Sequence, residues 1–266
     1  MVRAMLIAVL ITIGLQGNAQ TESRITRYNY FFLEAIRQQE MGNLAAAFDL
    51  LNHARDINPK APEVYYEIAG YYVAMQNSKA ARYNFEQAAK LAPDNSTYLE
   101  KLGQFYISQN NYEDALTTYE QLYTSNKTRE DVLQILYQLY GAQNNYKKMI
   151  EMIERMELLS GASEQLSLTK MQIYEQMGDK RKAQAELLRL VQKNPLELNY
   201  RVMLGNWLLQ NNKKKEAYNE YQTVLKEDPN NAAAQLSLLD YYRDTKNEKM
   251  VDELTRKLLE SKKTEK

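Results

Sequence analysis

The chain has 266 residues, of which 44% are hydrophobic, so it can bury a sizeable core. Lys and Arg together number 34, as do Asp and Glu, and this balance argues against a nucleic-acid-binding protein, which usually carries a basic excess. Only 9 glycines and 5 prolines accompany 21 tyrosines, a composition that favours helices with aromatic packing over turn-rich sheets.

The first 19 residues have the layout of a secretory signal peptide. Arg3 precedes a largely apolar run from Ala4 to Leu15, and Gly17 and Ala19 place small side chains just before a cut at Gln20. A bilayer-spanning helix needs about 20 apolar residues, so we expect no stable membrane span. The alternative is an uncleaved N-terminal anchor.

The chain contains no cysteine. Small exported domains often depend on disulfides, and this chain does without them. An exported chain without disulfides favours a bacterial periplasm or envelope over a eukaryotic extracellular location.

The prolines indicate an internal repeat. Pro59, Pro93, Pro195 and Pro229 are separated by multiples of 34 residues, which is the signature of a repeat architecture. A lead-in at 20–27 is followed by seven repeats over 28–265. The predicted starts of these repeats are Tyr28, Pro62, Ser96, Glu130, Glu164, Leu198 and Ala232.

Each repeat is predicted to be a helix, a tight turn and a second helix. In the second repeat, Ala81, Phe85 and Ala88 recur at the spacing of one helical face. Turn pairs such as Gly42-Asn43 and Asn110-Asn111 suit the left-handed conformation that ends a helix. Proline at the repeat end stops the second helix, because it cannot donate an intrahelical hydrogen bond.

These residues resemble the tetratricopeptide repeat. The third repeat has Leu99, then Leu102-Gly103 and Tyr106 on its first helix, followed by Ala115 and Tyr119, in the spacing of the family's pattern. The resemblance covers most of the chain. It implies an all-α, right-handed α-solenoid of seven helix-turn-helix repeats that binds other proteins.

The resemblance also implies that the first helices line a concave groove where ligands bind. The residues expected on this wall are Phe32, Ile36, Tyr66, Val73, Gln104, Ile107, Gln138, Gln172, Val202, Asn206 and Leu209. The amides among them could follow the backbone of an extended peptide, since amides both donate and accept hydrogen bonds. The alternative is that glutamine serves only as a good helix former on a solvated face.

Relatives that clamp an acidic C-terminus use a lysine and asparagine set on adjacent first helices. Here Tyr66-Glu67 and Glu100-Lys101 stand at the corresponding places, so that class of partner is not expected.

No motif indicates catalysis, a metal or a cofactor. His53 is the one histidine, and it lacks the cysteines or further histidines that a zinc site needs. We therefore expect a non-enzymatic protein with no cofactor.

Two functions remain open at this point. The first is an exported scaffold that binds an extended peptide or protein segment in the groove. The alternative is a structural assembly or oligomerisation subunit of an envelope complex. Solenoids need a polar cap at each end, and the last predicted helix is followed only by a lysine-rich tail. Either the last repeat caps itself, or the chain continues into something longer, or a partner covers the C-terminal end.

Overall fold

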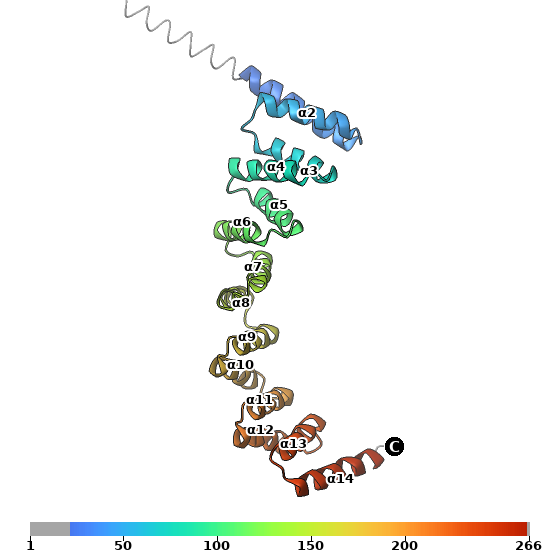
Figure 1. The fold of residues 1–266 in the computed structure, drawn as a ribbon, viewed down its shortest axis with the longest axis vertical. Coiled ribbons are helices and arrows are strands. Elements are labelled where there is room, and N and C mark those ends of the chain that lie inside the picture. Colours follow the sequence, from blue (N-terminus) through green and yellow to red (C-terminus); the bar gives the residue numbers. More distant parts are fainter. Residues whose placement is uncertain (1–21, 265–266) are drawn as a thin grey trace, which may run out of the picture. The chain divides into compact units, whose positions relative to one another are not determined.

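The computed structural model describes residues 22–264, with side chains as far as residue 259. The predicted signal peptide lies outside this range. The described residues form helices joined by turns and short loops, as predicted, and Figure 1 shows them in chain order. A helical segment at 22–40 includes most of the predicted lead-in. It is followed by α2 (Leu44–Ile57), α3 (Pro62–Ala74), α4 (Ser78–Leu91), α5 (Ser96–Ser108), α6 (Tyr112–Ser125), α7 (Glu130–Ala142), α8 (Tyr146–Ser160), α9 (Glu164–Gln176), α10 (Lys180–Lys193), α11 (Leu198–Gln210), α12 (Lys214–Glu227), α13 (Ala232–Asp244) and α14 (Glu248–Thr264).

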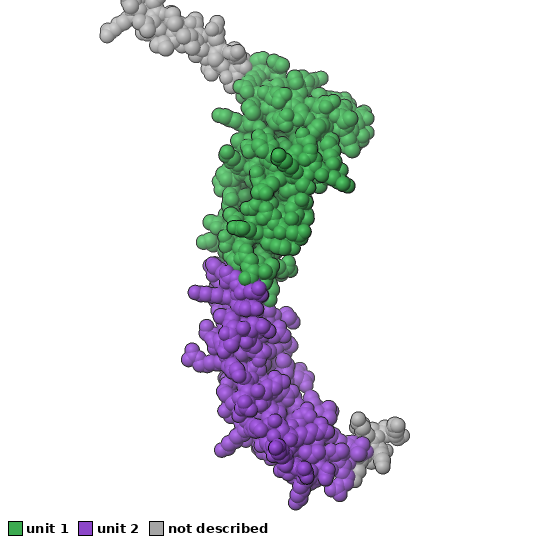
Figure 2. Space-filling view, in the orientation of Figure 1, with its two compact units in different colours: residues 1–143 green, residues 144–266 purple. Residues whose placement is uncertain are grey.

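The chain divides into two compact units, Met1–Gln143 and Asn144–Lys266 (Figure 2). In the first unit α3 packs on α4 and α5 on α6, while α2, α4 and α6 each also contact the helix that follows. In the second unit α9 packs on α10, α11 on α12 and α13 on α14. Each unit thus contains stacked helical hairpins, with α7 at the end of the first unit and α8 at the start of the second, which confirms the predicted helical-repeat solenoid.

The turn inside each hairpin has one recurring conformation. The residue before the N-cap of the second helix has a positive φ at Gly42, Gln76, Asn110, Asn144, Gly178, Asn212 and Lys246. At five of these turns the N-cap side chain accepts a hydrogen bond from a backbone N–H three residues later, as Asn77 does from Ala80 at 3.1 Å, whereas Asn43 and Lys213 make no such bond. Such caps satisfy N–H groups that the helix itself leaves unpaired.

In two hairpins, α5–α6 and α11–α12, close helix approach depends on a glycine. A Cβ added at Gly103 on α5 would lie 2.7 Å from a ring carbon of Tyr119 on α6, and one at Gly205 on α11 would lie 2.4 Å from Tyr221 on α12. Both tyrosine rings are fully buried. The glycine of the first helix therefore leaves the space that the tyrosine ring of the second helix occupies.

Candidate functional site

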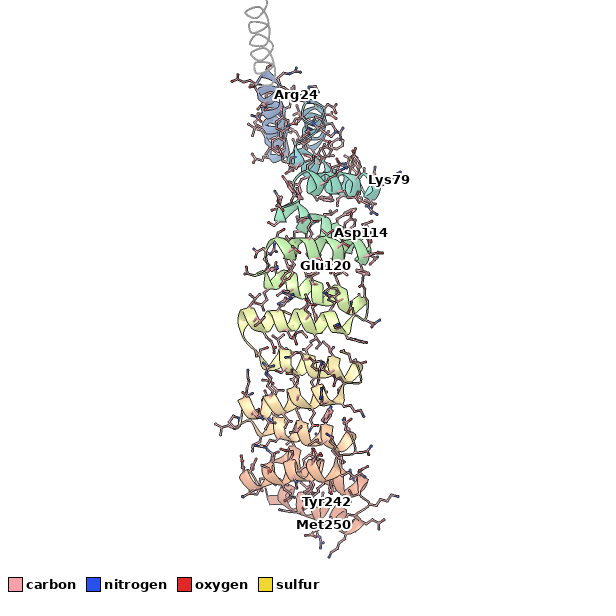
Figure 3. All side chains as sticks on the ribbon, turned by 90° about the vertical axis from the view of Figure 1, so that its left-hand side faces the viewer. Arg24, Lys79, Asp114, Glu120, Tyr242 and Met250 are labelled. Atoms are coloured by element: carbon pink, nitrogen blue, oxygen red, sulfur yellow. The ribbon has the colours of Figure 1, made fainter. Side chains whose placement is uncertain are left out.

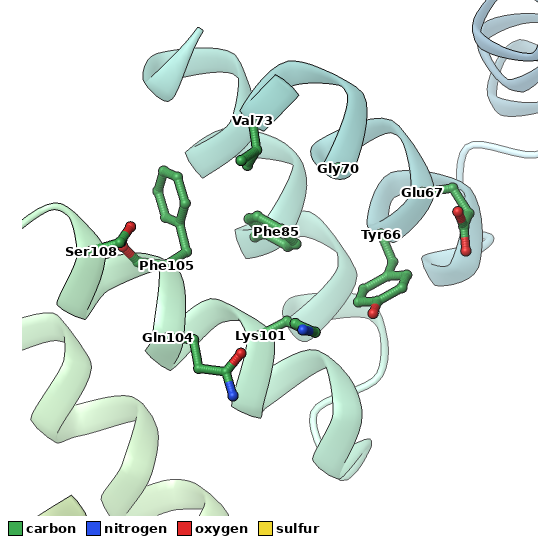
Figure 4. A pocket seen from close by; sticks show the side chains of 9 residues that line it. All are labelled: Tyr66, Glu67, Gly70, Val73, Phe85, Lys101, Gln104, Phe105 and Ser108. Carbon is green, nitrogen blue, oxygen red and sulfur yellow. The ribbon is translucent and has the colours of Figure 1, made fainter. Parts of the chain in front are cut away.

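A pocket of about 430 Å³ opens between α3 and α5, the first helices of the second and third repeats. We call it the α3–α5 pocket, and Figure 4 shows its lining. All of its residues belong to the first compact unit. They are Tyr66, Glu67, Gly70, Val73, Phe85, Lys101, Gln104, Phe105 and Ser108.

Gly70 leaves room on the α3 side. It lies inside α3, and a Cβ built there would have no neighbouring atom within 4 Å. A glycine inside a helix costs about 1 kcal/mol relative to alanine, so the position gives up helix stability. In return, the wall of the pocket carries no side chain at this point.

Aromatic rings form the apolar end of the pocket. Phe85, from α4, lies 5.4 Å from the ring of Phe105, and Tyr66 meets Phe85 edge-on at 6.3 Å. Figure 4 shows Phe85 between two groups, with Val73 and Phe105 on one side and Tyr66 and Lys101 on the other. Phe85 and Phe105 are buried beneath the surface, whereas Val73 is exposed.

Polar side chains of α5 also line the pocket. Lys101 and Gln104 lie one turn apart on the exposed face of α5. Glu100, the residue before Lys101, is paired with Arg129 at 2.9 Å. No ion pair within the described residues includes Lys101, so its ammonium is available to a ligand.

A second cavity of about 210 Å³ adjoins the first, and the two share Glu67 and Gly70. Its other lining residues are Gln39, Leu44, Tyr71 and Ala74. The hydroxyl of Tyr71 donates to Gln39 Oε1 at 3.1 Å, and the Gln39 side chain also hydrogen-bonds Glu67. Burial raises the pKa of the Glu67 carboxyl, while the hydrogen bond from Gln39 opposes that rise.

Three of the predicted wall residues, Tyr66, Val73 and Gln104, meet in the α3–α5 pocket. Val202 is placed differently from our prediction. Only 5% of its surface is exposed, because it packs against Val224 of α12 and Ala234 of α13. Val202 is therefore a core residue of the second unit and is withdrawn from the wall.

The remaining predicted wall residues are dispersed. Phe32 is half-buried and stacks on Tyr28, with ring centroids 5.9 Å apart. Asn206 accepts a hydrogen bond from the buried Tyr221 hydroxyl at 2.9 Å, so its amide oxygen serves the hairpin core. Two sets complete the list: the half-buried Ile36, Ile107 and Leu209, and the exposed Gln138 and Gln172.

The sequence pattern missed two kinds of residue. The helical pattern indicates that Phe85 and Phe105 are core residues. Only the packing of α3, α4 and α5 shows that they also line a pocket. Lys170 occupies the place where Ile68 and Leu102 are buried in other repeats. A lysine at the repeat position that Ile68 and Leu102 occupy was the signal in the sequence that could have revealed a buried, paired charge.

Lys170 is 4% exposed and joins a buried ionic cluster in the second unit. Its ammonium lies 2.9 Å from both Glu157 of α8 and Glu186 of α10. Arg189 reaches the same two carboxylates at 3.2 and 3.3 Å. Two cations thus compensate two anions, so this cluster joins α8, α9 and α10 without an unpaired charge.

Neither a metal site nor a spanning helix emerges in the described part of the chain. No group of three or more potential metal ligands comes together within residues 22–264. His53 is exposed, with its ring against Phe31 at 4.3 Å. Among the helices of these residues, none has both the length and the apolar character that crossing a bilayer requires.

Comparisons with known proteins place these features in context. A family model described as tetratricopeptide repeat matches residues 66–129 and 168–232. No curated protein matches the sequence.

Among solved structures, a chain in the structure of Naa15/Naa10 bound to HypK-THB is similar with a TM-score of 0.65 at 15% identity. The match covers 88% of this chain and 36% of that one, so this chain spans about a third of the other's length. A tetratricopeptide repeat protein from Parabacteroides merdae ATCC 43184 gives a TM-score of 0.48 at 15% identity, over 87% of this chain and 92% of its own.

Proposed function

Because the chain is a tetratricopeptide repeat protein, we propose that it is an exported, non-enzymatic scaffold that binds an extended protein segment along its first helices. The observation that carries this proposal is the α3–α5 pocket. It lies between α3 and α5, two successive first helices, and a second cavity adjoins it. Concave, largely apolar sites with a few polar groups are typical of ligand binding.

The location rests on the N-terminal sequence. A basic residue, an apolar run and small residues before Gln20 support export, and the absence of cysteine favours a bacterial periplasm or envelope. Proteins of that compartment are therefore the pool from which we expect the partner to come.

The proposed function is tested by capture of partners from an envelope extract on the immobilised chain, with identification by mass spectrometry. A variant with Gln104→Ala, Gln138→Ala and Gln172→Ala removes the exposed amides of three first helices. We expect this variant to retain the partner less well, because amides can hydrogen-bond an extended backbone.

The matched control places three alanines on second helices instead, at Lys79, Glu113 and Lys215, all of which are exposed. Figure 3 labels Lys79 near the start of α4. Capture that is unchanged in the glutamine variant would remove the amides from the binding wall. Failure of the unaltered chain to retain any protein would contradict the scaffold itself.

The second candidate function is a subunit of a larger envelope assembly. It is favoured by four large apolar side chains near the N-terminal end of the described residues, Tyr30, Leu33, Met41 and Leu44, each more than half exposed. Leu259, on α14, is an exposed apolar side chain where a partner could bind the C-terminal end. A rise in mass with concentration in light scattering would support assembly, and a monomer at high concentration would count against it.

A further inference from the structure

We propose that the α3–α5 pocket recognises a partner segment by one large apolar side chain next to the side-chain carboxylate of an aspartate or glutamate. This inference rests on the proposed scaffold function and names the chemistry of its partner. The apolar side chain occupies the space over Gly70, and the carboxylate pairs with Lys101.

The size of the pocket suits one or two side chains. Its volume of about 430 Å³ is near the lower end of the range for ligand sites. Phe85 and Phe105 form its apolar part, and a Cβ at Gly70, which lines the same pocket, would have no atom within 4 Å. Full burial of a leucine or phenylalanine there should tighten binding by about 10- to 150-fold.

The charge of Lys101 favours an acidic residue next to the apolar side chain of the partner segment. Lys101 is exposed and enters no ion pair within the described residues, and the carboxylate of the adjacent Glu100 pairs with Arg129 instead. Gln104 adds hydrogen-bonding capacity one turn further along α5. An exposed ion pair contributes little, so we expect the carboxylate to tighten binding by about 1.4- to 5-fold.

Glu67 gives the pocket a direction. Figure 4 shows its carboxylate on the opposite side of Tyr66 from Lys101. An acidic residue is therefore favoured on the α5 side of the apolar anchor and disfavoured on the α3 side, where the charge of Glu67 would repel it.

An extended protein segment fits this site better than a compact ligand. The second cavity continues from the pocket through Glu67 and Gly70, and its lining includes Gln39 and Leu44 of the first repeat. A chain that crosses three repeats can place its anchor in one cavity and a neighbouring side chain in the other. The polypeptide is thus the occupant to which we commit.

The experiment selects random short peptides, displayed without a free C-terminus, on the full chain and on three variants. Gly70→Leu fills the pocket, and no atom within 4 Å of its Cβ opposes folding. Lys101→Glu reverses the charge at the rim. Lys79→Leu adds the same leucine to the exposed face of α4, away from the pocket.

We expect the peptides enriched on the unaltered chain and on Lys79→Leu to carry a large apolar residue beside Asp or Glu. These peptides should not be enriched on Gly70→Leu. Their affinity for this variant, measured by fluorescence anisotropy, should be at least tenfold weaker, which corresponds to about 1.4 kcal/mol of binding free energy. Lys101→Glu should exchange the acidic neighbour for a basic one. Circular dichroism should show all variants folded.

Each other outcome overturns a stated part. Enriched peptides that still bind Gly70→Leu would refute the pocket and leave the scaffold function intact. Enrichment without an acidic neighbour would refute the role of Lys101. If no peptide is enriched, the proposed function fails as well. If self-association is lost in Gly70→Leu instead, the pocket belongs to a second copy of the chain.

Discussion

Glycines on the first helices perform two different tasks. Gly103 and Gly205 lie against buried tyrosine rings that leave no space for a Cβ. Gly70 faces open space in the candidate site. The repeat pattern identifies the first two as packing positions, whereas at Gly70 packing does not require a glycine.

The different surroundings of Gly70 and Gly103 predict opposite effects of an alanine substitution on stability. Both residues lie in the first compact unit, so the two variants can be compared directly. Gly70→Ala should stabilise the chain by about 1 kcal/mol, because alanine is the better helix former. Gly103→Ala should destabilise it by about 1–3 kcal/mol, because the Tyr119 ring is buried and must shift. Urea unfolding followed by circular dichroism measures both. Equal shifts of the two midpoints would contradict our account of the glycines.

Among the elements, the hairpin turns were the most predictable. Glycine or asparagine at the positive-φ position reflects the steric freedom or local hydrogen bonding that this conformation needs. Gln76 and Lys246 adopt the same φ of 57° without either advantage. Their conformation follows from the helices that they join, so at these turns the hairpin geometry overrides residue preference.

The ionic cluster is the element-scale feature that sequence reasoning missed. Lys170 stands at a core position of α9, and its two carboxylate partners come from α8 and α10. A lysine is tolerated in a core only when paired, and here the partners are 13 and 16 residues away in the sequence. Helical periodicity therefore could not identify them.

We predict that Lys170→Met destabilises the second unit by about 3–5 kcal/mol, because Glu157 and Glu186 would then share Arg189 alone. Adding Glu157→Met and Glu186→Met should restore most of the loss, since apolar replacements remove the uncompensated charges. Thermal unfolding of the single and triple variants measures this. A single variant as stable as the unaltered chain would show that the cluster is unimportant.

At the scale of the whole molecule, the chain forms two compact units divided at Gln143 and Asn144. The division falls between α7 and α8, the two helices of the predicted fourth repeat. In that repeat Met149 stands where Ala81 and Ala115 occupy the second helices of earlier repeats. The boundary thus coincides with a departure from the small-residue pattern.

Export gives the prediction at this scale. If residues 1–19 are a signal peptide, the mature chain should begin at Gln20 and be recovered from the periplasm or envelope fraction. Intact-mass measurement of the purified protein checks the start. Ala19→Arg should block cleavage, because the site requires a small residue there, and processing that is unaffected by this change would contradict the proposal.

The sequence by itself determined the helical-repeat fold and the 34-residue period, and it identified three residues of the candidate site, Tyr66, Val73 and Gln104. These features are accessible because helical periodicity, turn residues and prolines act over short distances along the chain. Only the tertiary structure placed Phe85 and Phe105 in the pocket, buried Val202 beneath α12 and α13, and gave Lys170 its partners. Each of these depends on contacts between different helices, which the pattern of a single repeat does not encode.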